Sequence, residues 1–199
     1  MRQPHKKQSL VLSLKAAARK VLRRPSGRYA SETSKCRARL LPYCTGYGVD
    51  LGFGGDPIST HAIRVDSPQP YANTGESPVQ LGGDATKLHW FRDGVLDFVY
   101  SSHLLEDFPD TETVLREWLR VLKPGGNLVI FCPDEQIYRA HCRRTGQIYN
   151  SNHKHADFSL QIIKNSLNHI GGVRFIHETP LVDIYSWELV AQKTPETKS

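Results

Sequence analysis

The chain has 199 residues, of which 39% are hydrophobic and 23% are charged, and its formal net charge is +6. This length suits one compact domain with residues left over for an extra segment. No stretch approaches the roughly 18 consecutive apolar residues that a membrane-spanning helix needs. The composition therefore excludes a helical membrane protein and favours a cytoplasmic one.

The four cysteines form no C-x-x-C pair, which is the usual spacing of zinc ligands and redox pairs. We therefore expect reduced thiols in an intracellular protein, without a metal site and without disulfides. The residues concerned are Cys36, Cys44, Cys132 and Cys142.

The charge is unevenly spread along the chain. Residues 1–44 contain 12 Lys and Arg and a single acid, Glu32, whereas residues 45–199 contain 14 Lys and Arg and 19 acids. The sequence thus predicts a basic N-terminal extension, residues 1–44, joined to a mildly acidic domain, residues 45–199.

Residues 9–24 of this extension have the spacing of a helix, with apolar residues on one face and basic residues on another. Pro25, Ser26 and Gly27 end the pattern. Three interpretations stay open: a basic helix packed on the domain, a surface for nucleic acid, anionic lipid or a phosphorylated substrate, and an organellar transit peptide.

From Tyr47 onward, short apolar strands alternate with helical patterns. Helices are predicted at 115–126, where Pro124 and two glycines stop the pattern, and at 157–172, where Asp157 is the expected N-cap. Strands are predicted at 47–51, 62–66, within 79–86, and at 96–102, 127–133, 173–180 and 185–193.

This alternation predicts an α/β fold of the doubly wound, Rossmann-like kind. We expect a seven-stranded, mostly parallel sheet with an antiparallel late strand and with helices on both faces. Sheets of this kind bind ligands at the carboxyl ends of their strands.

Acidic residues stand at or just past the ends of the first three predicted strands. Asp50 leads into the glycine-rich turn Gly52–Gly55, and Asp66 ends the second strand. A carboxylate at Asp66 can accept hydrogen bonds from both ribose hydroxyls. The step Asp84–Ala85, after the third strand, can meet an adenine edge, because a carboxylate accepts from an amino group and a backbone N–H donates to a ring nitrogen.

Two other nucleotide-binding motifs fit this turn less well. A dinucleotide fingerprint, G-x-G-x-x-G, would need a glycine where Pro57 stands. A phosphate-binding loop would need Gly-Lys-Ser/Thr, but Asp56 follows Gly55 and would repel phosphate. The acidic edge suits a ligand that carries positive charge and no phosphate.

The ordered motifs resemble those of the class I S-adenosylmethionine-dependent methyltransferases, most closely the type 11 group. The resemblance runs from about Val49 to Pro133 and rests on "DLGFGG", "VD" at 65–66, "GDA" at 83–85, "LDFVYSSHLLEDFPD" and "LREWLRVLKPGGNLVIFCPD". Two departures lie in these motifs: Asp107 follows Glu106 where the family usually has histidine, and Pro57 stands where many relatives begin a helix.

The resemblance implies S-adenosyl-L-methionine as the cofactor and methyl transfer as the activity. The cofactor-binding residues that we expect are Asp50, Gly52, Phe53, Gly54, Gly55, Asp66, Asp84, Ala85 and Ser101.

The candidate catalytic residues are His103 and Glu106, just past the fourth strand, where the methyl group should lie. Methyl transfer needs a base only when the acceptor must lose a proton, and a histidine titrates near neutrality. His103 can equally be a loop histidine that lines the pocket, and Glu106 can orient His103 or begin the next helix.

Two further groups of polar residues admit more than one interpretation. His153, His155 and Asp157 can line the substrate pocket, and a metal site is disfavoured because no other ligand clusters with them. The following residues can hold an anionic acceptor or form a solvated basic face: Arg139, His141, Arg143, Arg144 and Tyr149.

Cys132, at the end of the fifth strand, is interpreted as a buried cysteine rather than a nucleophile, because the Pro-Cys motif of cytosine methyltransferases is absent.

The function predicted from the sequence is transfer of a methyl group to an oxygen or nitrogen atom of a small-molecule or glycan-like acceptor. Two alternatives remain: an RNA methyltransferase that uses the basic extension to bind nucleic acid, and a methyltransferase-like module that binds cofactor or RNA without turnover.

Overall fold

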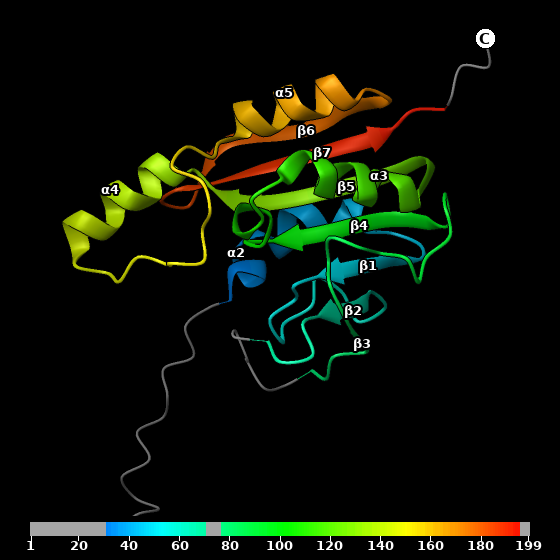
Figure 1. Cartoon of the computed structure of the whole chain (residues 1–199), viewed down its shortest axis with the longest axis horizontal. Coiled ribbons are helices and arrows are strands. Elements are labelled where there is room, and N and C mark those ends of the chain that lie inside the picture. Colours follow the sequence, from blue (N-terminus) through cyan, green and yellow to red (C-terminus); the bar gives the residue numbers. More distant parts are fainter. Residues whose placement is uncertain (1–30, 71–76, 196–199) are drawn as a thin grey trace, which may run out of the picture. The chain divides into compact units, whose positions relative to one another are not determined.

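The computed structural model of the chain describes residues 31–70 and 77–195 (Figure 1). The predicted helix at 9–24 lies outside these residues. Seven strands form one sheet in the order β3-β2-β1-β4-β5-β7-β6. They are β1 (Gly48–Leu51), β2 (Ile63–Asp66), β3 (Leu81–Gly82), β4 (Leu96–Ser102), β5 (Leu122–Pro133), β6 (Val173–Val182) and β7 (Ser186–Lys193).

The direction of the strands confirms the predicted doubly wound sheet. Strands β3, β2, β1, β4 and β5 pair in parallel, and β7 runs antiparallel to both of its neighbours, β5 and β6. The chain order reverses at β1, which lies between β2 and β4. Such a reversal leaves a crevice at the carboxyl ends of the strands, where ligands bind.

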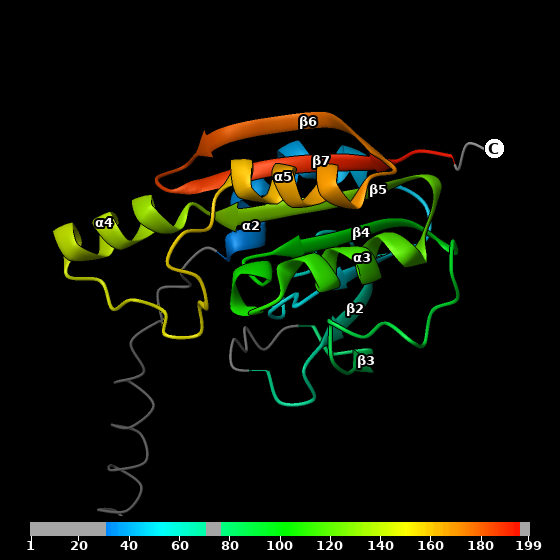
Figure 2. The same cartoon turned by 45° about the horizontal axis from the view of Figure 1, so that its top comes forward.

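Helices cover both faces of the sheet (Figure 2). Helices α3 (Thr111–Val121) and α5 (Leu160–Ile170) pack on one face, and α2 (Glu32–Leu40) packs on the other. Helix α4 (Glu135–Thr145) follows β5, and two short 3-10 helices are η1 (Leu41–Tyr43) and η2 (Leu105–Asp107). Among the described residues, no helix is both long and apolar enough to cross a membrane.

The core follows from the alternation of side chains along the buried strands. In β4, Phe98 and Tyr100 point to the α2 face, whereas Val99 points to the α3 and α5 face. Trp118 and Trp187, both fully buried, anchor the latter side. Because both faces are covered, these strands are almost continuously apolar.

Two local predictions were wrong, and one helix was not foreseen. The predicted helix 115–126 ends at Val121, and β5 begins at Leu122, because a residue before proline, here Lys123, is driven out of helical geometry. The N-cap of α5 is Ser159, not Asp157, since burial of Phe158 against Trp187 displaces the start of the helix. Helix α4 was not predicted.

The segment 31–44, assigned to the extension by its charge, packs against the sheet. Cys36, Leu40 and Cys44 are fully buried together with Phe98 and Phe131 of the sheet. The compact unit of the structure begins at Ser31. Two basic residues of α2 pair with acids of the domain, Arg37 with Asp56 and Arg39 with the buried Glu188, so the charge of this segment does not separate it from the domain.

We expect Leu40→Ala to lower the free energy of unfolding by about 2–4 kcal/mol, the usual cost of a cavity in a core. Leu41→Ala is the matched control, because the neighbouring Leu41 is 38% exposed and should cost less than about 1 kcal/mol. Urea unfolding measures both variants. Equal costs would contradict the packing of α2 in the core.

Candidate active site

The glycine-rich turn after β1 begins the candidate site. The N–H of Gly52 donates to the carbonyl of Val65 at 2.8 Å, which continues the pairing of β1 with β2. Gly52, Gly54 and Gly55 have φ of 66°, 57° and 91°, in the left-handed region that glycine favours. A Cβ atom on Gly52 would lie 2.8 Å from Cδ2 of Leu104. The turn therefore packs directly against the tip of β4.

The carboxylates of Asp50 and Asp66 accept hydrogen bonds from backbone N–H groups in and just after this turn. Asp50 is fully buried, and its Oδ2 accepts a hydrogen bond from the N–H of Ile58 at 2.6 Å. Oδ2 of Asp66 accepts from the N–H of Gly54 at 3.2 Å, and its Oδ1 accepts from Ser67 at 2.7 Å. Burial raises the pKa of both carboxyls above its ordinary value. Asp50 and Asp66, both predicted to bind the cofactor, thus fix the backbone of the turn through hydrogen bonds.

The tip of β3 lies beside Asp66. The N–H of Gly83 donates to the carbonyl of Asp66 at 2.9 Å. Ala85 is buried, and its carbonyl accepts a hydrogen bond from Nε1 of Trp118 at 2.8 Å. Oδ1 of Asp84 accepts from the backbone and hydroxyl of Thr86, which lowers the pKa of Asp84. The step Asp84–Ala85 is thereby fixed next to the acid of β2.

The tip of β4 carries the predicted base. Ser101 is buried, with its hydroxyl 3.4 Å from the carbonyl of Leu51. His103 has φ 49°, and its Nε2 lies 3.2 Å from Oγ of Ser186 and 3.3 Å from Oε2 of Glu32. Burial lowers the pKa of His103 to about 4. His103 is therefore neutral at pH 7 and is a weak proton acceptor.

Glu106 lies deeper, in η2, with a carboxyl group that is only half satisfied. The side chain is 1% exposed, and its Oε2 accepts a hydrogen bond from Sγ of Cys132 at 3.3 Å. Within the described part of the chain, its Oε1 has no hydrogen-bond partner. Burial raises the pKa of Glu106 to about 8, and the nearby charges of Asp107 and Glu135 contribute to the increase.

Residues from α4 and the segment after it complete this region, and the sequence analysis missed one of them, Glu135. Oε2 of Glu135 lies 2.8 Å from Nδ1 of His153. Its Oε1 accepts from Nε of Arg139 at 2.6 Å and from the hydroxyl of Tyr149 at 2.5 Å. Arg139 and Tyr149, considered above for an anionic acceptor, thus belong to a buried network. Glu135 stands two residues past the end of β5, and Asp66 is the last residue of β2, so an acid close to a strand end is the signal that could have found Glu135.

The other polar candidates lie elsewhere. Nε2 of His155 is 2.7 Å from the carbonyl of Phe108, and Asp157 is exposed. In the ranges 31–70 and 77–195, no group of three acidic, His or Cys side chains is arranged to hold a metal ion. All four cysteines are free and buried, and Cys132 serves as a hydrogen-bond donor.

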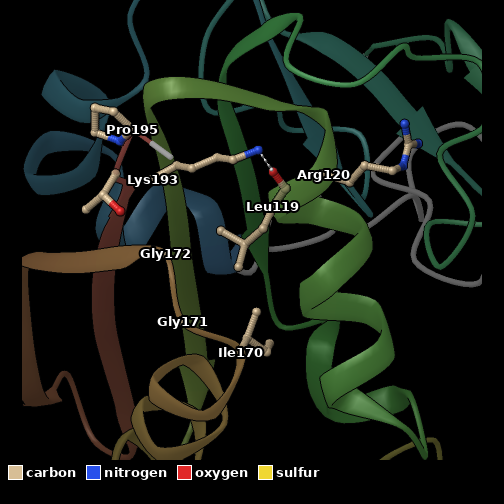
Figure 3. A pocket seen from close by; sticks show the side chains of 8 residues that line it. Leu119, Arg120, Ile170, Gly171, Gly172, Lys193 and Pro195 are labelled. Carbon is tan, nitrogen blue, oxygen red and sulfur yellow. Dashed lines mark hydrogen bonds between the residues drawn. The ribbon is translucent and has the colours of Figure 1, made fainter. Parts of the chain in front are cut away.

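A depression lies at the other end of the strands, near the amino ends of the parallel strands. It is formed by the C-terminal ends of α3, α5 and β7 (Figure 3). Lys193 points from β7 toward α3, and its Nζ donates to the carbonyls of Leu119 and Leu122 at 2.8 and 2.9 Å. This lysine caps the helix end, so we attribute the depression to packing and not to the chemistry of the site.

The residues present fit an S-adenosylmethionine-type cofactor. Asp66 and Asp84 stand at adjacent strand ends, where their carboxylates could accept hydrogen bonds from a ribose and an adenine. Two buried oxygens, Oδ1 of Asp50 and Oγ of Ser102, have no partner among the described residues. The edge thus combines a nucleoside-sized set of acceptors with negative charge, which defines a nucleoside-cofactor protein of the doubly wound class.

Comparison with known proteins finds a family model that matches part of the chain. Residues 36–130 match the type 11 family model, described as a methyltransferase domain. Over this stretch, slightly less than half of the chain, the protein is similar to the methyltransferase domains of the type 11 group. The cofactor of this family is S-adenosylmethionine.

Solved structures of several methyltransferases share the fold. A protein from Pyrococcus horikoshii has a TM-score of 0.63 at 22% identity, covering 85% of this chain and 93% of that one. A putative methyltransferase from Haloferax volcanii, solved with the Trm112 methyltransferase activator, has a TM-score of 0.63 at 18% identity, covering 94% and 98%.

Two curated relatives match over short segments. Demethylmenaquinone methyltransferase of Mycolicibacterium paratuberculosis is 47% identical over 51 residues, which is 26% of this chain and 22% of the relative. That of Streptomyces avermitilis is 52% identical over 48 residues, or 24% and 20%. The match covers about a fifth of the length of each relative.

We expect Gly52→Ala to destabilise the protein more than Gly125→Ala, by about 1–3 kcal/mol, the usual cost of overpacking. Both glycines have positive φ, 66° and 83°, but a Cβ on Gly125 would meet nothing within 4 Å. The control thus carries the same backbone strain without the contact with Leu104. Equal unfolding free energies in urea would show that the turn does not pack on β4.

The Glu106 carboxyl should make stability depend on pH. Its pKa is 4.5 ordinarily and about 8 when buried, so between these values the unfolded chain releases a proton that the folded protein keeps. The folded state therefore loses stability as pH rises from about 4.5 to about 8.

We expect Glu106→Gln to remove this loss. Relative to the unchanged protein, the variant should gain about 1–3 kcal/mol more at pH 8 than at pH 5, as measured by urea unfolding. Glu112→Gln is the control, because the exposed Glu112 pairs with Arg116, which lowers its pKa. A gain for Glu106→Gln that is the same at both pH values would argue against a protonated Glu106.

Proposed function

We propose that this protein transfers a methyl group from S-adenosylmethionine to an oxygen or nitrogen atom of a small-molecule or glycan-like acceptor. The observation that supports this most directly is the convergence of the Gly52 turn, Asp66 and the Leu104 segment at one edge of the sheet. The match of residues 36–130 to a methyltransferase domain supports the same activity.

The chain's own residues would bind and orient the cofactor. Asp66 would accept hydrogen bonds from the ribose hydroxyls, and Asp84 with the backbone of Ala85 would bind the adenine edge. The Gly52 turn would pass beneath the methionine part, in a conformation that glycine favours because its φ is positive and Leu104 leaves no space for a side chain there. The bound cofactor supplies an activated methyl group, so positioning can provide up to about 7–11 kcal/mol of the acceleration.

The region just past the β4 tip would receive the acceptor, and its side chains suit an acceptor that must lose a proton on methylation. Three buried side chains with ionisable or hydrogen-bonding groups, His103, Glu106 and His153, lie together just past the β4 tip. A site that only excluded water would have no need to bury them, since each buried polar group carries a desolvation cost.

A quinone-like acceptor is the second candidate. It is favoured by the two demethylmenaquinone methyltransferases that share 47% and 52% identity with segments of this chain. The shared segments are about a quarter of this chain.

Binding of S-adenosylhomocysteine tests the cofactor site. We expect Asp66→Ala to weaken binding by about 1–3 kcal/mol, the scale of lost hydrogen bonds to a charged group. Asp93→Ala is the control, because Asp93 is exposed, pairs with Arg120 and precedes the amino end of β4. Calorimetric titration measures both, and unchanged affinity in Asp66→Ala would show that the ribose binds elsewhere.

An acceptor screen tests the activity itself. The full chain is incubated with S-adenosylmethionine and with hydroxyl, amine, glycan and quinone acceptors, demethylmenaquinone included, and release of S-adenosylhomocysteine is measured. Release with any acceptor excludes a non-catalytic binding module. Binding of the cofactor without release across the screen would favour that module.

A further inference from the structure

We infer that His153, oriented by Glu135, is the general base that takes the proton of the acceptor, and that Glu106 hydrogen-bonds the reacting group. This inference rests on the proposed methyl transfer. It assigns the base to a residue that follows α4 instead of His103 at the β4 tip.

The hydrogen bond between Glu135 and His153 fixes the tautomer of the imidazole. Nδ1 of His153 lies 2.8 Å from Oε2 of Glu135, so Nδ1 carries the hydrogen and donates it. The other carboxylate oxygen accepts from Arg139 and Tyr149, so every group that contacts Glu135 is a donor. Nε2 of His153 is therefore left with its lone pair free to accept a proton.

The nearest acidic oxygen to that lone pair, Oε1 of Glu106, is too far away to form a hydrogen bond with it. Nε2 of His153 is 3.7 Å from Oε1 of Glu106, and Nδ1 of His103 is 3.8 Å from the same oxygen. Both distances are too long for hydrogen bonds. Oε1 of Glu106 is buried and has no partner in the described part of the chain. A hydroxyl or amino group that lies beside both atoms could donate to His153 and accept from a protonated Glu106.

This position lies at the cofactor edge of the sheet. Glu106 follows the tip of β4, and Glu135 follows the tip of the adjacent strand β5. Leu104, two residues before Glu106, contacts the Gly52 turn. The N–H of Lys154 donates to the carbonyl of Glu106 at 2.9 Å, which holds the His153 segment against η2.

His103 is less suited to the same task. Its Nε2 is already shared between Ser186 and Glu32, and burial lowers its pKa to about 4. An efficient base has a pKa near the working pH. His103 is better placed to orient the acceptor from the other side of Glu106.

The lone pair of the acceptor's oxygen or nitrogen forms a bond to the methyl carbon, and the carbon–sulfur bond breaks with its electron pair remaining on sulfur. The proton of the acceptor moves to Nε2 of His153, and the resulting imidazolium is stabilised by Glu135 until the proton passes to water. Four side chains contact His153: Glu135 and Tyr138 of α4, Glu106 of η2, and Tyr149 of the segment that joins α4 to His153.

The first test needs no cofactor. Nitrogen-15 NMR of the full chain at neutral pH reports which ring nitrogen of His153 carries the hydrogen, with the signal assigned by its loss in His153→Gln. We expect the Nδ1–H form. A predominant Nε2–H form would overturn the inference, because Nε2 could not then accept a proton.

The second test uses S-adenosylhomocysteine binding together with methyl transfer to hydroxyl acceptors, substituted phenols of graded acidity included. We expect His153→Gln to lower kcat by about 10²–10⁴-fold, the usual contribution of a general base. KM for the acceptor and the affinity for S-adenosylhomocysteine should change less than about threefold. The loss of kcat should shrink as the acceptor becomes more acidic, because such an acceptor needs less help to lose its proton.

His155→Gln is the matched control, because His155 lies on the same segment but bonds the carbonyl of Phe108. It should keep most of the activity. A His153→Gln variant that retains full kcat, or that loses no more than His155→Gln, would overturn the inference. The proposed function fails separately, if the unchanged protein neither binds S-adenosylhomocysteine nor methylates any acceptor, and the tautomer measurement then still decides the geometry at His153.

Discussion

The close approach of Gly52 to Leu104 is the contact on which the rest of the site depends. It brings the turn after β1 against the tip of β4, although the two are about fifty residues apart in the chain. Asp66 then closes the turn from the β2 side through the N–H of Gly54. A larger residue at position 52 would push these tips apart, so the glycine is required by packing as well as by its positive φ. The cofactor edge is thus set by a contact between two strand ends rather than by either loop alone.

Burial shifts the pKa values of His103 and Glu106, just past the β4 tip, in opposite directions. His103 is held neutral at pH 7 and Glu106 is held largely protonated, because the same apolar surroundings disfavour the charged form of each. Fixed negative charge is supplied instead one strand away, by Glu135, which three donors surround. Neutral and charged groups therefore alternate across a short distance, an arrangement typical of sites that move protons.

The sequence predicted the sheet well because strand ends and glycine turns are local signals. β1, β2, β4 and β7 lie where the apolar runs placed them, and Asp66 and Asp84 stand at the predicted edge. The site was predicted less fully, because its remaining groups are joined only by tertiary contacts. Glu32 reaches His103 from α2, across about seventy residues, and Ser186 reaches it from β7. No spacing in the sequence reports such meetings.

The segment before β1 shows how strongly tertiary contacts can override composition. Its basic character resembles that of residues 1–30, yet Arg37 and Ser31 both bond Asp56 in the glycine turn, and Arg39 pairs with the buried Glu188 of β7. Removing either partner of the last pair would leave a charge buried or unmatched, which is costly in a protein interior. Helix α2 therefore connects the cofactor turn to the far strands of the sheet. Glu32 also contacts His103, so the same helix reaches the tip of β4, and the compact unit that contains the sheet begins before β1.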